Sequence, residues 1–384
     1  MSIRLGALLT TYALAALITL ARASAEPSTL LVGRGQAITS IADAAGLARD
    51  GDTVMIMPGE YDGDVAVWRQ RKLRIVGLSP RPILRAAGAS AEGKAIWVFR
   101  DGDFTVENIE FRGARVADRN GAGIRFERGR LEVLRCRFID NQTGILTANF
   151  SDATLLIQDS EFRDAPTAPD GLPHLLYVGR IDSFEIRGSH LHGGRRGHLL
   201  KSRARRSRIA YNLILDDPTG GASYEIDLPD GGDVELIGNV VGQSAHTANP
   251  TLIAYGAEGA TWSTNRLHVA HNTLLASGWR PAWFVRSWLD AADIVTRNNL
   301  TVGIGAFTAL LPGDHDGNLA LPPDAFDATT LALRVPFDRL VAAWSPAPLD
   351  HEWHAWRPLR RFARPAGTAT RDDAVRAAPG ALPP

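Results

Sequence analysis

The sequence is poor in cysteine, in lysine and in net charge. Its single cysteine, Cys136, excludes an internal disulfide framework and a zinc site built from cysteines. Because 42 basic residues balance 42 acidic ones, the composition does not favour nucleic acid or an anionic membrane surface as a partner. Nearly all of the positive charge is arginine, since only Lys72, Lys94 and Lys201 are lysines.

Long apolar runs are absent except near the N-terminus. There Arg4 precedes the apolar stretch Leu5–Leu20, and small residues follow up to Ala25. This pattern is typical of a secretory signal peptide, whereas the alternative, a transmembrane anchor, needs about 20 apolar residues. We therefore expect a signal peptide at residues 1–25, no stable membrane insertion after its cleavage, and a periplasmic or secreted location.

What the sequence does contain is one short pattern repeated eight times: apolar, any, apolar, any, any, small polar, any, apolar. Its sixth positions are Ile109, Cys136, Ser160, Ser189, Asn212, Asn239, Asn272 and Asn299. They follow one another at intervals of 23 to 33 residues. Each copy holds two or three short strands and has no room for a crossover helix, which predicts a β-solenoid.

The repeat also predicts which residues stack inside the solenoid. Alternation along the strands points one set of apolar residues inward, each above its equivalent one coil away. That set includes Val133, Ile157, Ile186, Ile209 and Leu236. The four asparagines at the sixth position are expected to form a ladder of side-chain amides along the axis, which is a structural role.

The residues before the repeat have the pattern of a cap. Ile38–Ala48 has the apolar spacing of a short helix, Thr53–Met57 reads as a strand and Pro58–Tyr61 as a turn. These segments resemble the N-terminal cap of pectate-lyase-like β-helix proteins. The resemblance implies an all-β fold: a single-stranded right-handed parallel β-helix with a short N-terminal capping helix and an irregular C-terminal tail.

The expected organisation follows from where the repeat starts and stops. The parts are the signal peptide at 1–25, the cap at 26–51, the β-helix at 52–305 and the C-terminal tail at 306–384. A cap covers the open edge of the first coil, which otherwise invites aggregation. The tail is expected to pack along the solenoid or to close its C-terminal end.

Coils five to eight of the predicted solenoid are unusually rich in polar and aromatic residues. The segments are His174–Arg180, His198–Arg203, Ser223–Leu228 and Thr251–Gly256, with Glu258 just beyond. Counted from the following repeat, Tyr177, Lys201 and Asp227 fall within one residue of each other. Equivalent positions of stacked coils lie about 4.8 Å apart, so they form a polar strip roughly 10–15 Å long. Its length suits a few sugar units, whose rings and hydroxyls favour aromatic and charged neighbours.

Glu225 and Asp227 stand two residues apart on one predicted strand. Alternation points both carboxylates outward and turns Ile226 inward. Neighbouring carboxylates repel each other, and either Lys201 on the next coil or a bound Ca²⁺ would relieve the repulsion. The sequence establishes no cofactor. The alternative is a solvated acidic face without a function.

Lys201 is the residue that we single out for chemistry. Arginine cannot give up its proton near neutral pH, whereas a lysine beside Arg203 can have a lowered pKa and act as a base. The alternative is a surface lysine that pairs with Glu225 or Asp227.

Histidines and arginines are also concentrated in this part of the chain. The histidines are His174, His190, His192 and His198. Their spacing matches no zinc signature, so the sequence predicts no metal site. The arginines are Arg195, Arg196, Arg203, Arg205, Arg206 and Arg208. In a chain of zero net charge, this local basic patch favours an acidic polysaccharide over nucleic acid.

The pair Lys201–Ser202, followed by Ile209, resembles a segment of the chondroitinase B and alginate lyase family. The resemblance implies that the lysine is the base that removes the C5 proton of a uronate. It also implies a Ca²⁺ that neutralises the sugar carboxylate and an arginine one coil later that assists the leaving group. Only the lysine matches cleanly, because Gly197–Leu200 lacks the acidic ligand and Pro229 stands near the expected arginine.

The sequence thus predicts a monomeric, extracytoplasmic β-helix protein that acts on an acidic polysaccharide as a lyase or a C5-epimerase. One alternative is a glycoside hydrolase using two carboxylates among Glu225, Asp227 and Glu258. Another is a non-catalytic glycan-binding or surface scaffold protein. The expected catalytic residues are Lys201, Arg203, Tyr224, Glu225 and Asp227. The expected substrate-binding residues are His174, Tyr177, Arg180, His198, Tyr255 and Glu258.

Overall fold

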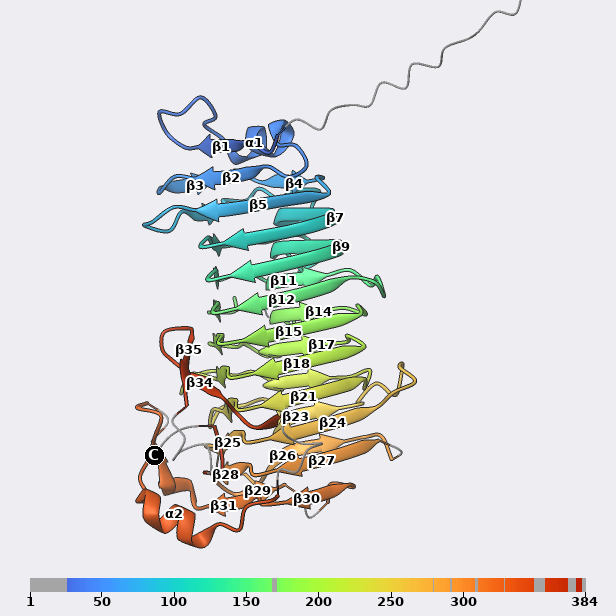
Figure 1. Cartoon of the computed structure of the whole chain (residues 1–384), viewed down its shortest axis with the longest axis vertical. Coiled ribbons are helices and arrows are strands. Elements are labelled where there is room, and N and C mark those ends of the chain that lie inside the picture. Colours follow the sequence, from blue (N-terminus) through green and yellow to red (C-terminus); the bar gives the residue numbers. More distant parts are fainter. Residues whose placement is uncertain are drawn as a thin grey trace, which may run out of the picture.

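The computed structural model describes residues 26–167, 171–278, 280–290, 292–307, 310–327, 329–348, 356–371 and 378–381. The predicted signal peptide, residues 1–25, lies outside these ranges. The described chain forms an elongated right-handed parallel β-helix, so the predicted fold class is confirmed (Figure 1). None of its described helices is long and apolar enough to cross a membrane.

The strands of successive coils pair in parallel on three faces. The first face consists of β4 (Ala66–Trp68), β11 (Thr143–Thr147), β14 (His174–Val178), β17 (Leu200–Ser202), β20 (Ile226–Leu228), β23 (Thr251–Tyr255), β26 (Ala282–Ser287) and β29 (Gly305–Ala306). The second face consists of β1 (Thr29–Val32), β2 (Thr53–Ile56), β5 (Lys72–Gly77), β12 (Thr154–Gln158), β15 (Ser183–Arg187), β18 (Arg206–Ala210), β21 (Asp233–Ile237), β24 (Arg266–Ala270), β27 (Asp293–Arg297) and β30 (Asp314–Asp316). Two longer strands, β7 (Ala95–Glu107) and β9 (Ala122–Leu134), run through both of these faces.

The third face is a separate sheet made of short strands. Its members are β3 (Glu60–Asp62), β6 (Ile83–Arg85), β8 (Glu110–Arg112), β10 (Arg137–Ile139), β13 (Glu161–Arg163), β16 (His190–His192), β19 (Leu213–Leu215), β22 (Val240–Gln243), β25 (Thr273–Ala276), β28 (Leu300–Val302) and β31 (Leu319–Leu321).

A short helix, α1 (Ile41–Leu47), covers the N-terminal end of the stack. It begins at Ser40, whose hydroxyl accepts a hydrogen bond from the Asp43 N–H at 3.0 Å. The Asp64 carboxylate accepts a second free N–H of the first turn, that of Ile41, at 2.6 Å. Ile41 is buried and the helix packs on β1 and β4, so the first open coil is shielded.

Apolar side chains fill the interior in columns that run along the axis. The rings of Phe111, Phe138 and Phe162 stack with centroids 5.1 and 4.6 Å apart. The residues predicted to stack inward are paired coil to coil and are at most 1% exposed: Val133, Ile157, Ile186, Ile209 and Leu236. Each buried apolar side chain of this size contributes about 1.5–3 kcal/mol, so these columns are the main source of stability.

An asparagine ladder follows the turn between the second and third faces. Asn212 donates to the Oδ1 of Asn239 at 3.0 Å, Asn239 to Asn272 at 2.9 Å, and Asn272 to Asn299 at 3.1 Å. Each of these amides also donates to a backbone carbonyl of a preceding coil. The predicted structural role is confirmed, and Asn318 extends the ladder by one coil at 2.8 Å.

The stack of coils continues beyond residue 305. β29, β30 and β31 pair with β26, β27 and β28 and carry the solenoid to Leu321. The expected boundary at 305 is therefore too early. The repeat in the sequence does not reveal the last coil, because its second-face strand, Asp314–Asp316, has no inward apolar residue that would continue the pattern.

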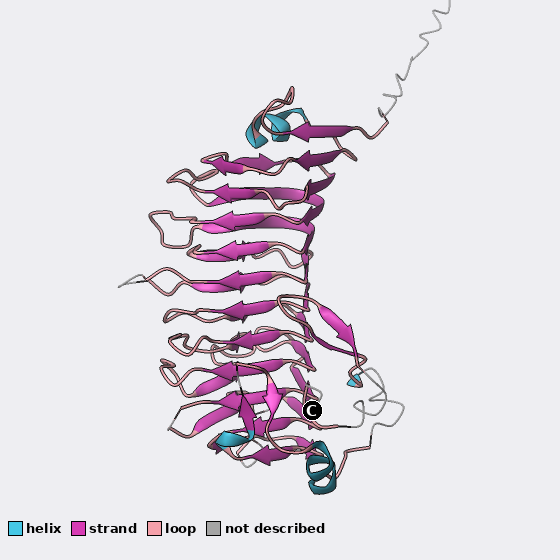
Figure 2. Cartoon of the chain, turned by 90° about the vertical axis from the view of Figure 1, so that its left-hand side faces the viewer, coloured by secondary structure: helices cyan, strands magenta, loops and turns pink. Residues whose placement is uncertain are grey.

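The C-terminal segment lies along the side of the solenoid (Figure 2). Its elements are η1 (Pro323–Ala325), β32 (Phe326–Asp327), β33 (Ala332–Leu333), α2 (Phe337–Ala343), β34 (Arg360–Phe362) and β35 (Thr368–Thr370). Phe326, Leu340 and Phe362 pack on the outer side of the third face, on residues such as Leu213 and Val240. This packing covers apolar side chains of β19 to β28 that would otherwise face water.

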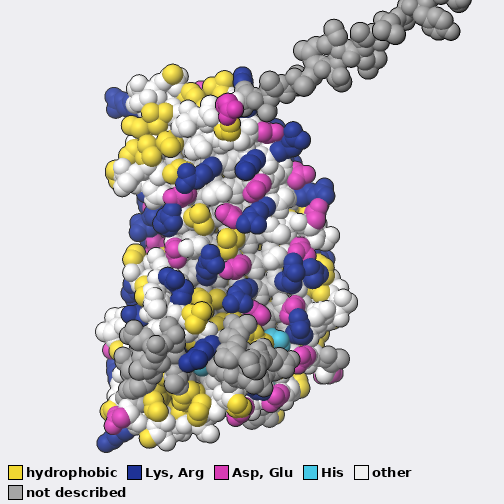
Figure 3. Space-filling view, viewed as in Figure 1, with side chains coloured by type: hydrophobic (Ala, Val, Ile, Leu, Met, Phe, Trp, Pro, Cys, Tyr) yellow, Lys and Arg dark blue, Asp and Glu magenta, His cyan; other side chains and the backbone are white. Residues whose placement is uncertain are grey.

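Basic and acidic side chains are interleaved on the face of the molecule seen in Figure 3. Ion pairs join neighbouring coils, as between Arg266 and Asp233 at 2.6 Å. The basic patch expected from the sequence is largely neutralised in this way. Arg205 and Arg206 both pair with Asp182, and Arg208 pairs with Glu235, so these arginines of the patch are held in ion pairs.

Candidate functional site

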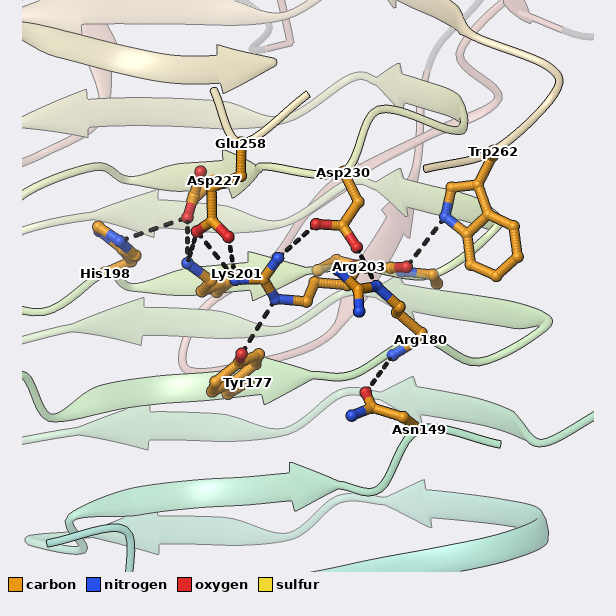
Figure 4. Close-up of polar contacts among 12 residues, drawn as sticks. Asn149, Tyr177, Arg180, His198, Lys201, Arg203, Asp227, Asp230, Glu258 and Trp262 are labelled. Atoms are coloured by element: carbon orange, nitrogen blue, oxygen red, sulfur yellow. Dashed lines mark hydrogen bonds and ion pairs between the residues drawn. The ribbon is translucent and has the colours of Figure 1, made fainter. Parts of the chain in front are cut away.

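Three neighbouring coils place Tyr177, Lys201 and Asp227 in one column on the outer side of the first face. In the parallel register Tyr177 pairs with Lys201, and Lys201 with Asp227, as the repeat spacing predicts. The preceding position of each strand points inward, as at Leu200, which is completely buried. The strand order therefore fixes three side chains of different chemistry next to one another (Figure 4).

The Lys201 ammonium group lies between two carboxylates. Its Nζ is 2.9 Å from Asp227 Oδ2 and 3.1 Å from Glu258 Oε1. The side chain is only 9% exposed. Burial works against the charge, but Asp227 and Glu258 outweigh burial and raise the pKa of Lys201. The expected lowered pKa is therefore wrong for this state of the protein, in which Lys201 is a cation.

Arg203, just after β17, joins the same network. Its Nε donates to the Tyr177 hydroxyl oxygen at 3.0 Å, and its Nη1 donates to Asp230. Its Nη2 contacts both oxygens of Glu258, at 2.8 and 2.7 Å. Burial opposes the charge, but Tyr177, Glu258 and Asp230 raise the pKa of Arg203. Lys201 and Arg203 are thus two neighbouring cations beside a tyrosine in this structure.

Asp230 is a site residue that the sequence analysis missed. Its carboxylate is 1% exposed and lies between Arg203 and Arg180, whose Nε is 2.5 Å away. It stands in a Pro-Asp-Gly sequence, and such sequences normally mark turns. The turn pattern alone cannot show that this aspartate is buried, because the arginines that pair with it lie on other coils.

Asn149 and Trp262 complete the frame of the site. Asn149 Oδ1 accepts the backbone N–H of Arg180 at 2.8 Å, and Trp262 Nε1 donates to the backbone carbonyl of Arg203 at 3.1 Å. Both residues hold the main chain of an arginine (Figure 4). Neither was expected, because each lies in a loop outside the repeat.

His174, His198 and Tyr224 form a ladder of stacked rings beside the ion network. Their ring centroids are 4.8 and 4.9 Å apart. The His174 Nδ1 accepts the His198 N–H at 3.0 Å, and His198 Nδ1 accepts the Tyr224 N–H at 3.2 Å. Burial lowers the pKa of His198 to about 2, so the ring is neutral. Its Nε2 then carries the hydrogen and faces Asp227 Oδ2 at 3.3 Å.

Asp227 receives two donors on one oxygen. Lys201 and His198 both approach Oδ2, whereas Oδ1 is buried and has no hydrogen-bond partner in the described part of the chain. Burial raises the pKa of Asp227, although Lys201 works in the opposite direction. Asp227 is therefore a carboxylate that can take up a proton more readily than an exposed one.

Glu225 does not belong to this outward cluster, contrary to the expectation. It is completely buried, and neither of its oxygens has a hydrogen-bond partner among the described residues. It precedes Ile226 as Leu199 precedes Leu200 and Leu252 precedes Ile253, and all these leucines belong to the core. The strands of this face turn two consecutive residues inward, so simple alternation assigns Glu225 to the wrong side.

Tyr255 also lies inside the solenoid and not on its surface. Its side chain is completely buried, and its hydroxyl donates to the backbone carbonyl of Gly232 at 2.7 Å. The expected role of Tyr255 in substrate binding is therefore wrong. The aromatic residue that the geometry does bring to the cations is Tyr177, over whose ring Lys201 Nζ lies at 5.7 Å.

The carboxylates of the site do not form an oxygen cage for Ca²⁺. Glu225 is enclosed in the core, and Asp227, Asp230 and Glu258 are each paired with Lys201 or Arg203. A calcium ion takes six to eight oxygen ligands, which is more than these paired carboxylates offer. The described residues of the site therefore do not fit a bound calcium ion.

No protein-family model and no curated protein sequence matches this chain. Five solved structures match it in fold. One is the crystal structure of pectate lyase Pel9A, with a TM-score of 0.58 and 11% identity over 91% of this chain and 93% of that one. Another is ORF18 of Geobacillus virus E2, with a TM-score of 0.44 and 13% identity over 74% of this chain and 56% of that one. At this identity the likeness to the pectate lyase shows the β-helix fold.

Proposed function

We propose that this protein is an extracytoplasmic polysaccharide lyase that cleaves a uronate-containing polymer by β-elimination. The observation that carries the proposal is the way in which Lys201 and Arg203 hold the carboxylate of Glu258. Both cations contact one oxygen, and Arg203 contacts the second as well. A carboxylate bound in this way is the group that distinguishes a uronate from a neutral sugar.

Glu258 is suited to be replaced by a substrate carboxylate. Its side chain is 51% exposed, whereas those of Lys201 and Arg203 are 9% and 13% exposed. It comes from the loop after β23, whereas Lys201 is also paired with Asp227 and Arg203 with Asp230. A sugar carboxylate that takes the place of Glu258 keeps both charge-assisted contacts and leaves the rest of the network intact.

The remaining residues can be assigned to the steps of β-elimination. Arg203 neutralises the uronate carboxylate and makes the C5 hydrogen more acidic. Lys201 first gives a proton to Asp227, its partner at 2.9 Å. This proton transfer is favoured once the substrate excludes water, because the ion pair is then desolvated. The neutral amine then takes the C5 proton, the C4–C5 double bond forms and the C4–O bond breaks.

Tyr177 supplies the proton for the leaving oxygen. Its hydroxyl oxygen accepts a hydrogen bond from Arg203 Nε at 3.0 Å, so its own hydrogen is free to be donated. Tyr177 then regains, through water, the proton that Asp227 took from Lys201, and Lys201 keeps the C5 proton, so all three residues return to their starting protonation states. A C5-epimerase begins with the same removal of the C5 proton, and differs only in that the carbanion is reprotonated from the other face.

The fold also favours this assignment. The described chain has the architecture of pectate lyase Pel9A, a protein whose name identifies it as a lyase of an acidic polysaccharide. The column of Tyr177, Lys201 and Asp227 lies on the outer surface of three stacked coils, where a linear polymer can lie along the axis. The polymer binds to a single copy of the chain in this proposal.

One observation favours a glycoside hydrolase as the second candidate. The environments of Asp227 and Glu258 move their pKa values apart, since burial raises that of Asp227 while Arg203 and Lys201 outweigh burial and lower that of Glu258. A raised and a lowered carboxyl pKa are what an acid and its partner carboxylate require. Glu225 is no longer available for this role, because it is enclosed.

The test is to expose the purified full chain, after removal of any signal peptide, to a panel of acidic polysaccharides. A rise in ultraviolet absorbance from the unsaturated uronate, lost in Lys201→Ala, is the expected result. New reducing ends without that absorbance indicate the hydrolase. Binding to an acidic polymer without either product contradicts both enzymatic proposals and indicates a glycan-binding protein.

A further inference from the structure

A second group of polar side chains lies on a different face of the solenoid, at the third-face strands β13 and β16. Glu161 on β13 pairs in register with His190 on β16. His190 and His192 flank the buried Leu191, so both imidazoles point to the outer side of the sheet. One ligand atom from each of Glu161, His190 and His192 can be chosen so that all lie within 4.8 Å of one another.

The contacts of His192 have the geometry of a metal ligand. Its Nε2 is 3.3 Å from Glu161 Oε1. Two ligands that share a tetrahedral zinc ion at about 2.0–2.1 Å lie roughly 3.3 Å from each other. Its Nδ1 is 3.2 Å from Asp217 Oδ1, which can accept the Nδ1 hydrogen, and a bound ion would replace the hydrogen bond that Nε2 makes with Glu161.

The other two candidate ligands are also available. Within the described residues, no hydrogen bond occupies a ring nitrogen of His190, whose ring lies over His192 at 4.1 Å. Glu161 Oε2 is 3.1 Å from Arg137 Nε, which orients the carboxylate while Oε1 faces His192. Arg163 Nε is 3.6 Å from Oε1, beyond hydrogen-bond distance.

A cavity of about 400 Å³ lies against this cluster. Both imidazoles and Asp217 line it, together with Thr329 and Arg364 of the C-terminal segment. The cavity leaves room for a fourth ligand, such as water or a small anion, and Arg364 places a positive charge beside it. Three protein ligands with an open fourth position are typical of zinc sites that take part in chemistry.

We propose that Glu161, His190 and His192 bind a divalent transition metal ion, with Zn²⁺ as the occupant and Asp217 as the residue that orients His192. Two imidazoles and one carboxylate suit Zn²⁺ or Fe²⁺ and do not suit Ca²⁺ or Mg²⁺, which prefer oxygen ligands. The site is separate from Lys201 and its neighbours, which lie on the first face. It does not depend on the proposed lyase activity.

The histidine spacing matches no zinc signature, so the sequence alone predicts no metal site here. A His-x-His pair on a strand presents both rings on one side, and the third ligand comes from another coil, 29 residues before His190 in the chain. Only the parallel register brings Glu161 to the pair.

The experiment is a Zn²⁺ titration of the untagged full chain, by calorimetry and by metal analysis after dialysis. We expect one saturable equivalent, which His190→Ala and His192→Ala each abolish. Asp217→Asn should weaken binding about 10- to 100-fold, because an orienting partner tunes affinity without being a ligand. His246→Ala, at a histidine on another coil, is the matched control and should bind zinc as the unchanged protein does.

A second readout keeps the proposal falsifiable if a variant folds poorly. Co²⁺ bound at this site should show the visible absorption of a four- or five-coordinate ion with nitrogen and oxygen ligands, and Zn²⁺ should raise the melting temperature of the unchanged protein. The proposal is overturned by the absence of saturable binding, by equal binding in the His190→Ala/His192→Ala double variant, or by loss of binding in His246→Ala. Preference for Fe²⁺ over Zn²⁺ would keep the site and change its occupant.

Discussion

Lys201 and Asp227 occupy paired positions on neighbouring coils, and their side chains meet with Nζ 2.9 Å from Oδ2. Their side chains are 9% and 3% exposed, so the contact is largely shielded from water. Asp227 therefore both fixes the ammonium group and offers the proton acceptor that the proposed elimination needs.

Asp227→Asn should remove the proton acceptor while it keeps the shape of the side chain. We expect the rate of elimination to fall by about 10²–10⁴-fold, the usual contribution of proton transfer. Because Lys201 keeps only Glu258 as a partner, stability should fall by about 1–3 kcal/mol. Steady-state kinetics and denaturant unfolding measure the two effects. Unchanged kcat in a folded variant would remove Asp227 from the mechanism.

Glu225→Leu should stabilise the protein. Glu225 lies in the register column of Leu199 and Leu252 and has no hydrogen-bond partner in the described structure. An unpaired polar group in an apolar interior costs about 1–3 kcal/mol, and leucine matches its neighbours. We expect a gain of this size at neutral pH in denaturant unfolding, with activity unchanged. A loss of stability would mean that the carboxyl group has a partner or a bound water that holds it in place.

Glu225 should also make stability depend on pH. Burial, together with the charge of Asp216, raises the pKa of Glu225 well above its usual value. The unfolded chain releases this proton near pH 4.3 or so, whereas the folded chain keeps it to higher pH. Stability must therefore fall as pH rises from the unfolded pKa through the folded pKa, by up to about 1.4 kcal/mol per pH unit.

Glu225→Gln provides the matched control for this dependence, because it keeps the size of the side chain and removes the titration. The difference in unfolding free energy between the two proteins should widen in favour of Glu225→Gln as pH rises above the unfolded pKa of about 4.3. Parallel curves for the two proteins over this range would show that Glu225 does not titrate abnormally.

The sequence could predict the register of the site but not the direction of every side chain. The alignment of Tyr177, Lys201 and Asp227 can be predicted because each residue stands about the same number of positions before the next copy of the repeat. Equivalent positions of stacked coils lie side by side. Glu225 was misplaced because the strands of the first face turn two consecutive residues inward. The doublets Leu175–Leu176, Leu199–Leu200 and Leu252–Ile253 carry that signal in the sequence, and strict alternation overlooks it.

Asp230 shows a second limit of the sequence. Its partners Arg180 and Arg203 are 50 and 27 residues away in the chain, and nothing local distinguishes a buried acid from a turn residue. Ion pairs between coils depend on how far side chains extend from one coil to another. The sequence pattern of a single coil does not contain this information. The group of Glu161, His190 and His192 could not be predicted from the sequence for the same reason.

Tyr177→Phe and Tyr255→Phe should have opposite effects. Tyr177 faces the cations, and removal of its hydroxyl takes away the proposed proton donor, so activity should fall by about 10²–10⁴-fold with little change in stability. The Tyr255 hydroxyl donates to the Gly232 carbonyl inside the core, so its loss should cost about 1 kcal/mol of stability with activity kept. Kinetics and thermal unfolding of both variants, measured side by side, separate the two roles.

Glu258→Gln tests whether Glu258 occupies the place of the substrate carboxylate. Glutamine cannot form the ion pairs with Lys201 and Arg203, so an acidic polymer no longer competes with an internal carboxylate for the two cations. We expect KM for an acidic polysaccharide to fall several-fold with kcat kept, and stability to change by about 1 kcal/mol or less, because the side chain is half exposed. Glu60→Gln, which removes a half-exposed carboxylate paired with Arg85 on another coil, is the control and should leave KM unchanged.

If Glu258 is instead a catalytic carboxylate of a glycoside hydrolase, the Glu258→Gln change abolishes kcat. Because the two mechanisms move different kinetic parameters, this one variant decides between them.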